Sequence, residues 1–212
     1  MNEAELRKRP QQDRSRARVE TILDVALELI IEVGAENLAM REVARKAGVP
    51  IGSVYQYFPS KIAIIRELAK RNLDRVGVML RQELARLLAD YGGKPTPEQA
   101  VNRLVDAFFA RYAQHPEEIA VWAAAQGDPI LRQIDASDTR QTGEFLTPLI
   151  MVVLSLSDRD SAFALALLLA EVTVSAIRLS LTVESPLRER VIDKLKLMLT
   201  ATLEAHEPDA IP

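Results

Sequence analysis

The chain has 212 residues, a formal net charge of −3 and an apolar fraction of 48%, which is ordinary for a soluble globular protein. It has no cysteine, which excludes disulfides, thiolate zinc sites and thiol catalysis. Its two histidines, His115 and His206, lie far apart in the sequence. A histidine-based metal site or catalytic triad is therefore not expected, and no metal or cofactor is predicted.

The first segment of the chain is basic. Six basic residues and one acid lie between Arg7 and Arg18, although the whole chain is slightly acidic. Residues 1–14 are polar and contain a proline, so we expect a mobile basic arm there. Basic side chains can neutralise nucleic-acid phosphates, so Arg14 and Arg16 are candidate phosphate contacts, and each such contact would steepen the salt dependence of binding. The alternative is a solvated tail.

Two helices are predicted after this arm. The first begins at Ser15 and ends at Gly34, because its apolar residues recur at the i, i+3, i+4, i+7 spacing of one helix face. These residues are Val19, Ile22, Leu23, Ala26, Leu29, Ile30 and Val33. A short second helix is expected over 40–47.

Residues 43–61 are predicted to form a helix-turn-helix. Gly48 can adopt the left-handed conformation that ends a helix, and Pro50 fixes φ near the start of the next one. In the helix from Ile51 to Phe58, Val54 and Phe58 lie four residues apart and face the core. The outer surface then carries only small, hydroxyl and amide groups: Gly52, Ser53, Tyr55, Gln56 and Tyr57. Such an acid-free surface suits close approach to phosphates and base edges.

The rest of the chain is predicted to be helical. Ser60 is a suitable N-cap for a long helix that starts at Lys61 and extends to about Leu88. Asp158 and Ser185-Pro186 supply further predicted caps. Downstream helices are expected near 97–114, 116–126, 139–156, 158–183 and 186–206, with a less regular piece around 128–135. No segment alternates with period two, so an all-α fold is predicted.

No membrane span or signal peptide is expected, because the most apolar stretches are short or interrupted and the first residues carry no apolar run. A cytoplasmic protein is predicted. The helices near 158–183 and 186–206 are apolar on more than one face, so each needs two partners. A second copy of the chain is the expected partner, which gives a homodimer, and burial within the monomer alone is the alternative.

Residues 15–68 contain four short motifs in a fixed order: Glu32-Val33-Gly34, 43–49 (VARKAGV), 52–58 (GSVYQYF) and Ser60-Lys61. With these motifs, the segment closely resembles the DNA-binding domain of the TetR family of transcriptional repressors. It implies an all-helical homodimer. A three-helix DNA-binding domain over 15–62 would precede a helical domain over 63–212 that dimerises and binds a small-molecule effector.

The resemblance also implies roles for single residues. Gly52 and Ser53 would approach bases; Arg41, Tyr55, Tyr57 and Lys61 would contact the DNA backbone, with Arg41 or Tyr57 also able to touch a base. The amide of Gln56 both donates and accepts, so it can read an adenine edge. Ala39-Met40 stands where the family usually has threonines, so the cap of the second helix is either missing or moved to Asn37.

The C-terminal part contains no motif of its own. Its candidate effector-binding residues are Phe109, Tyr112, Trp122, Met151 and Glu171, although core packing is the alternative for the apolar ones and an interface pair with Arg178 is the alternative for Glu171. The predicted function is a repressor released from a palindromic operator by a small molecule. A non-specific architectural DNA-binding protein is the alternative, and a helical enzyme has no visible catalytic group.

Overall fold

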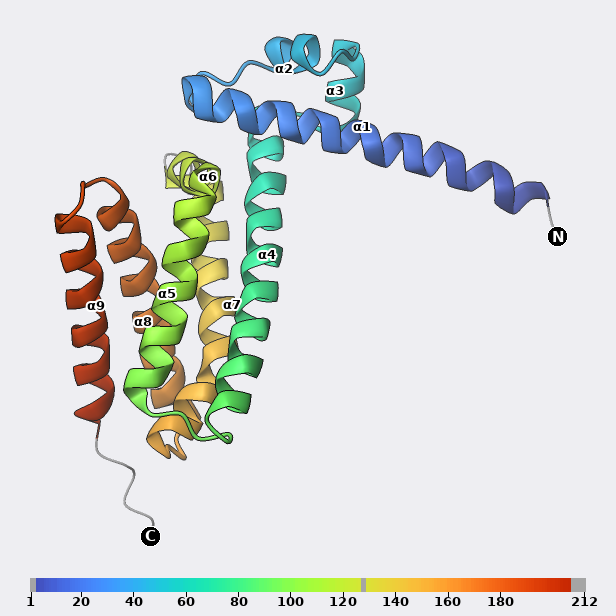
Figure 1. Cartoon of the computed structure of the whole chain (residues 1–212). Coiled ribbons are helices and arrows are strands. Elements are labelled where there is room, and N and C mark those ends of the chain that lie inside the picture. Colours follow the sequence, from blue (N-terminus) through green and yellow to red (C-terminus); the bar gives the residue numbers. More distant parts are fainter. Residues whose placement is uncertain (1–2, 127–128, 207–212) are drawn as a thin grey trace. The chain divides into compact units, whose positions relative to one another are not determined.

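The computed structural model describes the backbone of residues 3–126 and 129–206, and the side chains of residues 14–122 and 139–206. The described residues form nine α-helices and no strand, which confirms the all-α prediction (Figure 1). Contacts divide the chain inside the long fourth helix. The first unit comprises residues 1–72 and 120–132, and the second comprises 73–119 and 133–212. The sequence pattern places the boundary earlier, after residue 62.

The helices occur where the sequence predicts them, with two differences. Helix α1 begins at Glu3 rather than at Ser15, because the arm is rich in Glu, Arg, Lys and Gln, which are good helix formers. Residues 129–135 are the regular first turns of α7, with Pro129 at the start, where proline is tolerated. The helices are α1 (Glu3–Val33), α2 (Met40–Lys46), α3 (Ile51–Tyr57), α4 (Lys61–Asp90), α5 (Pro97–Gln114), α6 (Pro116–Gln126), α7 (Pro129–Leu154), α8 (Arg159–Leu181) and α9 (Leu187–Glu204).

The first unit is built on one face of α1. Ile22, Leu23 and Ala26 are fully buried, as the helical spacing predicts, and so are Val43 of α2 and Val54 of α3. Helix α2 packs against both α1 and α3. The buried apolar side chains of α1, α2 and α3 therefore fix the orientation of α2 and α3 within the first unit.

The second unit is a helical bundle in which α5, α8 and α9 pack on one another (Figure 1). Its main core cluster draws residues from α4, α5, α7, α8 and α9, including Leu80, Val105, Ile150, Ile177 and Leu195. Gly143 lets α7 approach α8 closely, since a Cβ there would lie 2.9 Å from a methyl of Leu167.

Helix α8 is long and apolar enough to cross a bilayer by length and composition, with 23 residues and an 18-residue window whose mean hydropathy is 1.9. The prediction that no stretch reaches this length was wrong on that point. One face of the helix packs in the core of the second unit, and 28% of that window is buried. Ala162, Ala166 and Ile177 are fully buried, and α8 packs on α5 and α9. Such a helix is weak evidence for a membrane span.

The predicted helix caps are partly confirmed. Ser60 accepts a hydrogen bond from the amide of Ala63 at 3.3 Å, and Asp158 accepts bonds from the first turn of α8. Ser185 does not cap α9. The N-cap position is Pro186, so Ser185 lies just outside the helix, where its hydroxyl donates to the carboxylate of Glu189 at 2.9 Å.

A buried ion cluster joins α4, α5 and α6 within the second unit, and sequence reasoning missed it. The side chain of Glu118 is 2% exposed, Arg111 donates a short hydrogen bond to it, and Arg75 lies 3.7 Å away. Burial raises the pKa of the Glu118 carboxyl, and the charges of Arg111, His115 and Arg75 act in the opposite direction. One oxygen of Glu118 and Nε of Arg111 have no hydrogen-bond partner among the described residues.

This cluster predicts a pH dependence of stability. A carboxyl whose folded-state pKa is raised binds its proton more tightly in the folded chain. Its stabilising contribution is therefore present below the ordinary pKa of 4.5 and is lost as the pH rises through the raised value. Urea unfolding from pH 4 to pH 8 should show wild type losing stability relative to Glu118→Gln over that window. A difference that stays constant with pH would contradict this account.

Candidate nucleic-acid interface

The turn between α2 and α3 is closed by backbone hydrogen bonds. Gly48 has φ +65°, its amide donates to the carbonyl of Arg45 at 3.3 Å, and the amide of Val49 donates to the carbonyl of Ala44 at 3.1 Å. This pair of bonds is the Schellman arrangement, which needs a left-handed residue in the place of Gly48. Pro50 then occupies the N-cap of α3. The predicted turn is confirmed.

Helix α3 divides into a buried and an exposed side. Val54 is fully buried and Phe58 is 7% exposed, as predicted. The predicted outer residues lie on the other side: Gly52, Tyr55 and Gln56 are exposed, and Ser53 and Tyr57 are half-buried. Ile51 is also exposed, at 39%, and was not among the predicted residues. Ile51 precedes Val54 by three residues and Phe58 by seven, so helical spacing places it on the buried face and offers no signal for its exposure.

Tyr57 has a partner inside the protein. Its hydroxyl lies 3.0 Å from Oγ of Ser15 on α1, and either oxygen can be the donor. This contact ties the last turn of α3 to α1. The predicted contact of Tyr57 with DNA stays a prediction, and it would use a hydroxyl that already has one partner.

Lys61 is also held by the protein. Its Nζ donates to the carbonyl of Glu36 at 2.6 Å and lies 3.5 Å from that of Ala35, both in the segment between α1 and α2.

The cap of α2 is absent rather than moved to Asn37. The N-cap of α2 is Ala39, whose side chain makes no capping hydrogen bond, and the side-chain amide of Asn37 donates to the backbone carbonyl of Val33 instead.

The basic residues near α3 differ in how well they are neutralised. Arg45 pairs with Glu42 at 2.8 Å, and hydrogen bonding to Arg45 lowers the pKa of Glu42. Lys46 pairs with Glu32 at 2.8 Å. The predicted DNA-binding arginines are also exposed, but unlike Arg45 and Lys46 they form no ion pair with another described residue: Arg14, Arg16 and Arg41.

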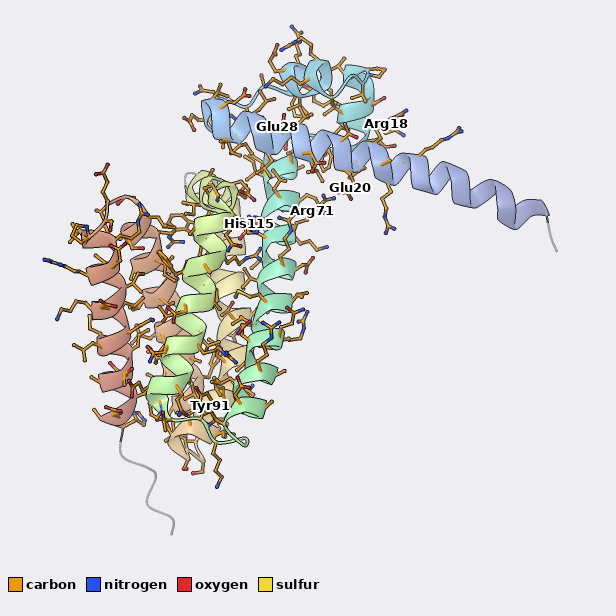
Figure 2. The ribbon with its side chains drawn as sticks, in the orientation of Figure 1. Arg18, Glu20, Glu28, Arg71, Tyr91 and His115 are labelled. Atoms are coloured by element: carbon orange, nitrogen blue, oxygen red, sulfur yellow. The ribbon has the colours of Figure 1, made fainter. Side chains whose placement is uncertain are left out.

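A further ion pair fixes α4 to α1 within the first unit. Arg71 donates to both carboxylate oxygens of Glu20, at 2.5 and 3.0 Å, and lies 3.6 Å from Glu67. Figure 2 shows the labelled side chains of Arg71 and Glu20 turned toward each other. A two-bond guanidinium–carboxylate pair restricts the relative orientation of two helices more than a single contact does.

The predicted effector-binding residues are not all brought together. Phe109, Tyr112 and Met151 are partly buried and pack against the main core cluster of the second unit. Glu171 is exposed on α8 and accepts hydrogen bonds from Thr139 and Ser175. Trp122 is half-buried and belongs to the first unit. An effector-binding role for these residues stays a prediction.

Two family models match the chain. The model described as "Bacterial regulatory proteins, tetR family" matches residues 22–68, and "Tetracyclin repressor-like, C-terminal domain" matches residues 95–207. The chain belongs to the tetR family. The first match covers the helix-turn-helix described above, and the second covers α5 to α9.

Individual tetR-family relatives agree with this assignment. The transcriptional repressor KstR of Mycolicibacterium smegmatis is 34% identical over 106 residues, which are 50% of this chain and 46% of that protein. The regulator BetI of Agrobacterium fabrum is 29% identical over 107 residues, 50% of this chain and 48% of that protein. The alignments thus span about half the length of these relatives.

Solved structures of similar proteins share the fold. A TetR-family transcriptional regulator from Streptomyces coelicolor is 26% identical, with a TM-score of 0.63 over 88% of this chain and 98% of its own. A transcriptional regulator from Pseudomonas aeruginosa has a TM-score of 0.66 at 13% identity, over 90% of this chain and 92% of its own. The latter likeness concerns the fold alone.

Two glycines of this tetR-family interface should respond in opposite ways to alanine. Gly48→Ala should lower the free energy of unfolding by about 1–2 kcal/mol, because a Cβ is unfavourable in the left-handed region. Gly52 is helical and a Cβ there meets nothing within 4 Å, so Gly52→Ala should raise stability by about 0.4–1 kcal/mol. Urea unfolding measures both. Equal effects at the two positions would contradict the turn geometry.

Substitutions of Arg41 and Lys61 should change different measured properties, the salt dependence of DNA binding for Arg41 and the stability of the fold for Lys61. Arg41→Met should reduce the slope of log affinity against log salt by about 0.9, the value for one phosphate contact. Lys61→Met should instead lower the free energy of unfolding by about 1 kcal/mol, because the Glu36 carbonyl loses its donor. Fluorescence anisotropy with a duplex and urea unfolding test the two effects. The reverse pattern would show that Lys61 acts mainly on phosphate.

Proposed function

We propose that this tetR-family protein is a homodimeric, sequence-specific DNA-binding transcriptional repressor that acts in the cytoplasm and is released from its operator by a small molecule. Helix α3 enters the major groove, and the symmetric second copy reads the other half of a palindromic site. The relatives reported above include a transcriptional repressor and a transcriptional regulator.

The observation that carries the proposal is the outer side of α3. Gly52 lets the helix backbone approach DNA, and the exposed side chains of Tyr55 and Gln56 provide hydrogen-bonding groups. No acid lies in α3, so nothing on the helix repels phosphate. The adjacent Arg41 supplies positive charge that no described carboxylate neutralises. Ile51 adds an apolar group suited to a thymine methyl.

Dimerisation is proposed through α8 and α9. Leu168 and Leu179 on α8 are 59% and 58% exposed, and Leu197 and Met198 on α9 are 60% and 61% exposed. Large apolar side chains exposed on two helices that pack together favour an interaction surface, and a second copy that packs the same two helices on these would cover them. A four-helix interface between the two copies results.

Release requires the effector to bind the state that does not fit DNA more tightly than the state that does. A coupling of about 1–3 kcal/mol lowers operator occupancy several-fold or more. Helix α4 runs without interruption from the first unit into the second. It is the covalent route by which a change in the second unit reaches the helix-turn-helix.

The alternative, a non-specific DNA-binding protein, is less consistent with the charges. Residues 62–212 carry 17 basic and 21 acidic residues, so this part of the chain does not attract DNA along its length. Binding would then be confined to the first unit. Binding by the first unit alone fits recognition of a short specific site better than non-specific binding along the length of a duplex.

The test is selection of duplexes by the purified full-length chain, followed by anisotropy on the selected site. Wild type should bind a palindrome at least about a thousand-fold more tightly than unrelated duplexes. Tyr55→Ala and Gly52→Ala should each weaken that preference. Tyr91→Ala, which changes an exposed tyrosine at the far end of α4, is the matched control and should bind as wild type does.

A second experiment, on the association state and on half-site binding, tests the dimer. Leu168→Glu should shift the protein toward monomer in analytical ultracentrifugation and reduce affinity for the full palindrome, while affinity for a single half-site changes little. Equal affinity of wild type for all duplexes would overturn the proposed function. Monomeric wild type with full operator affinity would overturn the dimer alone.

A further inference from the structure

The first part of helix α1 reaches beyond the core of the first unit. The first buried residue of the helix is Ile22, and none of residues 14–21 is buried. We call residues 3–21 of this helix the α1 extension. Residues 3–14 alone span about 17 Å at 1.5 Å per residue, which exceeds the width of a DNA major groove, about 12 Å. Figure 1 shows this part of α1 passing α3 and continuing away from it.

The α1 extension is attached to the end of the helix that is proposed to read DNA. Oγ of Ser15 lies 3.0 Å from the hydroxyl of Tyr57, the last residue of α3. A polar helix without buried apolar residues is only marginally stable in water, so a partner is expected to support it. The extension carries six basic residues between Arg7 and Arg18 against one acid. Its charge therefore indicates a polyanionic partner.

Helical geometry separates the arginines of the extension into two faces. Arg14 and Arg18 lie four residues apart and share one face, about 6 Å apart along the axis. Arg16 precedes Glu20 by four residues and shares the face of that acid, which is bonded to Arg71 of α4. Figure 2 labels Arg18 and Glu20 on opposite sides of α1, with Arg18 on the side of α3. Like charges four residues apart destabilise a helix, so the first face favours an external anion.

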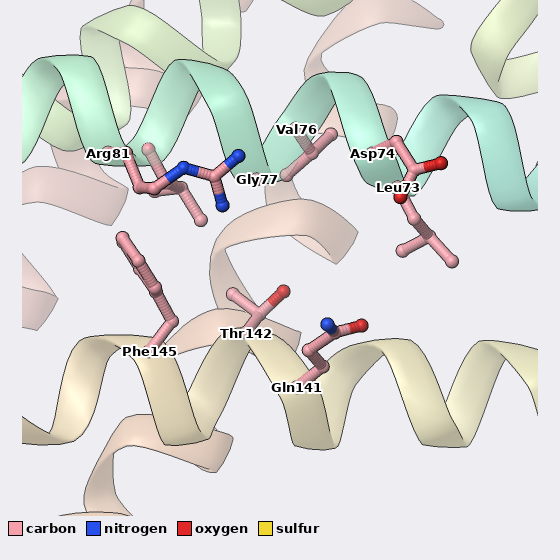
Figure 3. A pocket seen from close by; sticks show the side chains of 9 residues that line it. Leu73, Asp74, Val76, Gly77, Arg81, Gln141, Thr142 and Phe145 are labelled. Carbon is pink, nitrogen blue, oxygen red and sulfur yellow. The ribbon is translucent and has the colours of Figure 1, made fainter.

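An exposed basic residue without an ion pair does not by itself mark a binding site in this chain. Arg66, Lys70 and Arg81 of α4 are also exposed, and no ion pair links them to another described residue. Arg81 borders a groove between α4 and α7 (Figure 3), whose cavity volume of about 100 Å³ is below the range of small-molecule sites, about 300–1,000 Å³. The arginine pair of the extension differs, because the turn of helix that carries it is bonded to the last residue of α3.

We propose that the α1 extension is a second DNA-contact element, which lies along the sugar–phosphate backbone at the edge of the groove that α3 enters. Arg14 and Arg18 bind phosphates, and Arg16 stays in solvent. Of the two phosphate contacts predicted from the sequence, Arg14 is kept and Arg18 takes the place of Arg16. Both contacting arginines follow Pro10, whose missing amide weakens the helix on its N-terminal side. This contact deepens the proposed function and rests on the DNA binding of α3.

Anisotropy of the full-length protein between about 50 and 200 mM salt tests the contacts, on the selected palindrome and on an unrelated duplex. Arg14→Gln combined with Arg18→Gln should lower the slope of log affinity against log salt by about 1.8 per half-site, which is 0.9 for each contact. The ratio of the two affinities should change little, because phosphates carry no sequence information. Urea unfolding should match wild type, since both side chains are exposed.

Two controls remove the same kind of charge elsewhere. Arg66→Gln combined with Lys70→Gln removes two basic groups from α4, and Arg16→Gln removes one from the opposite face of the extension. Both controls should keep the wild-type slope. An equal fall per removed charge in either control would overturn the proposal, and so would an unchanged slope in the Arg14 and Arg18 variant.

A variant that keeps every charge tests the helix itself. Ala17 is exposed and lies between the two arginines of the pair. Ala17→Pro interrupts the helix before Arg18, so Arg14 should leave the DNA backbone and the slope should fall by about 0.9 per half-site. Ala17→Gln keeps the helix and should bind as wild type does. A wild-type slope in Ala17→Pro would indicate a flexible charged tail and would overturn the helical contact.

Hydroxyl-radical cleavage of the bound duplex locates the contact. Wild type should protect backbone positions at the groove edge that the combined Arg14 and Arg18 variant leaves open to cleavage. If wild type prefers its palindrome but neither slope nor protection depends on these arginines, the extension is not a DNA-contact element and the repressor function stands. If wild type binds all duplexes equally, the proposed function is overturned, and the difference in slope still decides the contact.

Discussion

The burial of Val54 is the contact on which the proposed DNA-reading surface depends. Val54 is inaccessible to solvent, and with Phe58 it holds one side of a seven-residue helix against the rest of the first unit. A helix this short has little stability of its own. Tertiary packing therefore decides which side chains face outward, and the Gly48 turn and the contact of Tyr57 with Ser15 fix the two ends of the same helix.

Most of the fold follows from sequence spacing. The i, i+3, i+4 pattern of α1 predicts the buried residues from Ile22 to Ile30, but Val33 on the same pattern is 45% exposed because it lies in the last turn of the helix. Gly48 and Ser60 predict a turn and a cap, because their roles depend on local backbone conformation. Helix starts are less well determined. The polar first segment continues α1 to Glu3, since helix propensity acts there without any apolar pattern to mark it.

Side-chain partners that are distant in sequence could not be predicted. The bonds from Lys61 to the Glu36 carbonyl, from Arg71 to Glu20 and from Arg111 to Glu118 each join different elements. A lysine or arginine at the edge of a DNA-binding motif looks available for phosphate in the sequence, and only the structure shows which ones are already engaged.

The exposed leucines of α8 and α9 set a condition on how the chain is made. In the proposed dimer, a newly synthesised copy presents Leu168, Leu179, Leu197 and Met198 to water until a partner covers them. Exposed apolar patches promote aggregation, and pairing is second-order in chain concentration. Synthesis of several chains close together, as on one polysome, would shorten this exposed stage. Folding yield, rather than DNA affinity, is then the first property to suffer when pairing is slow.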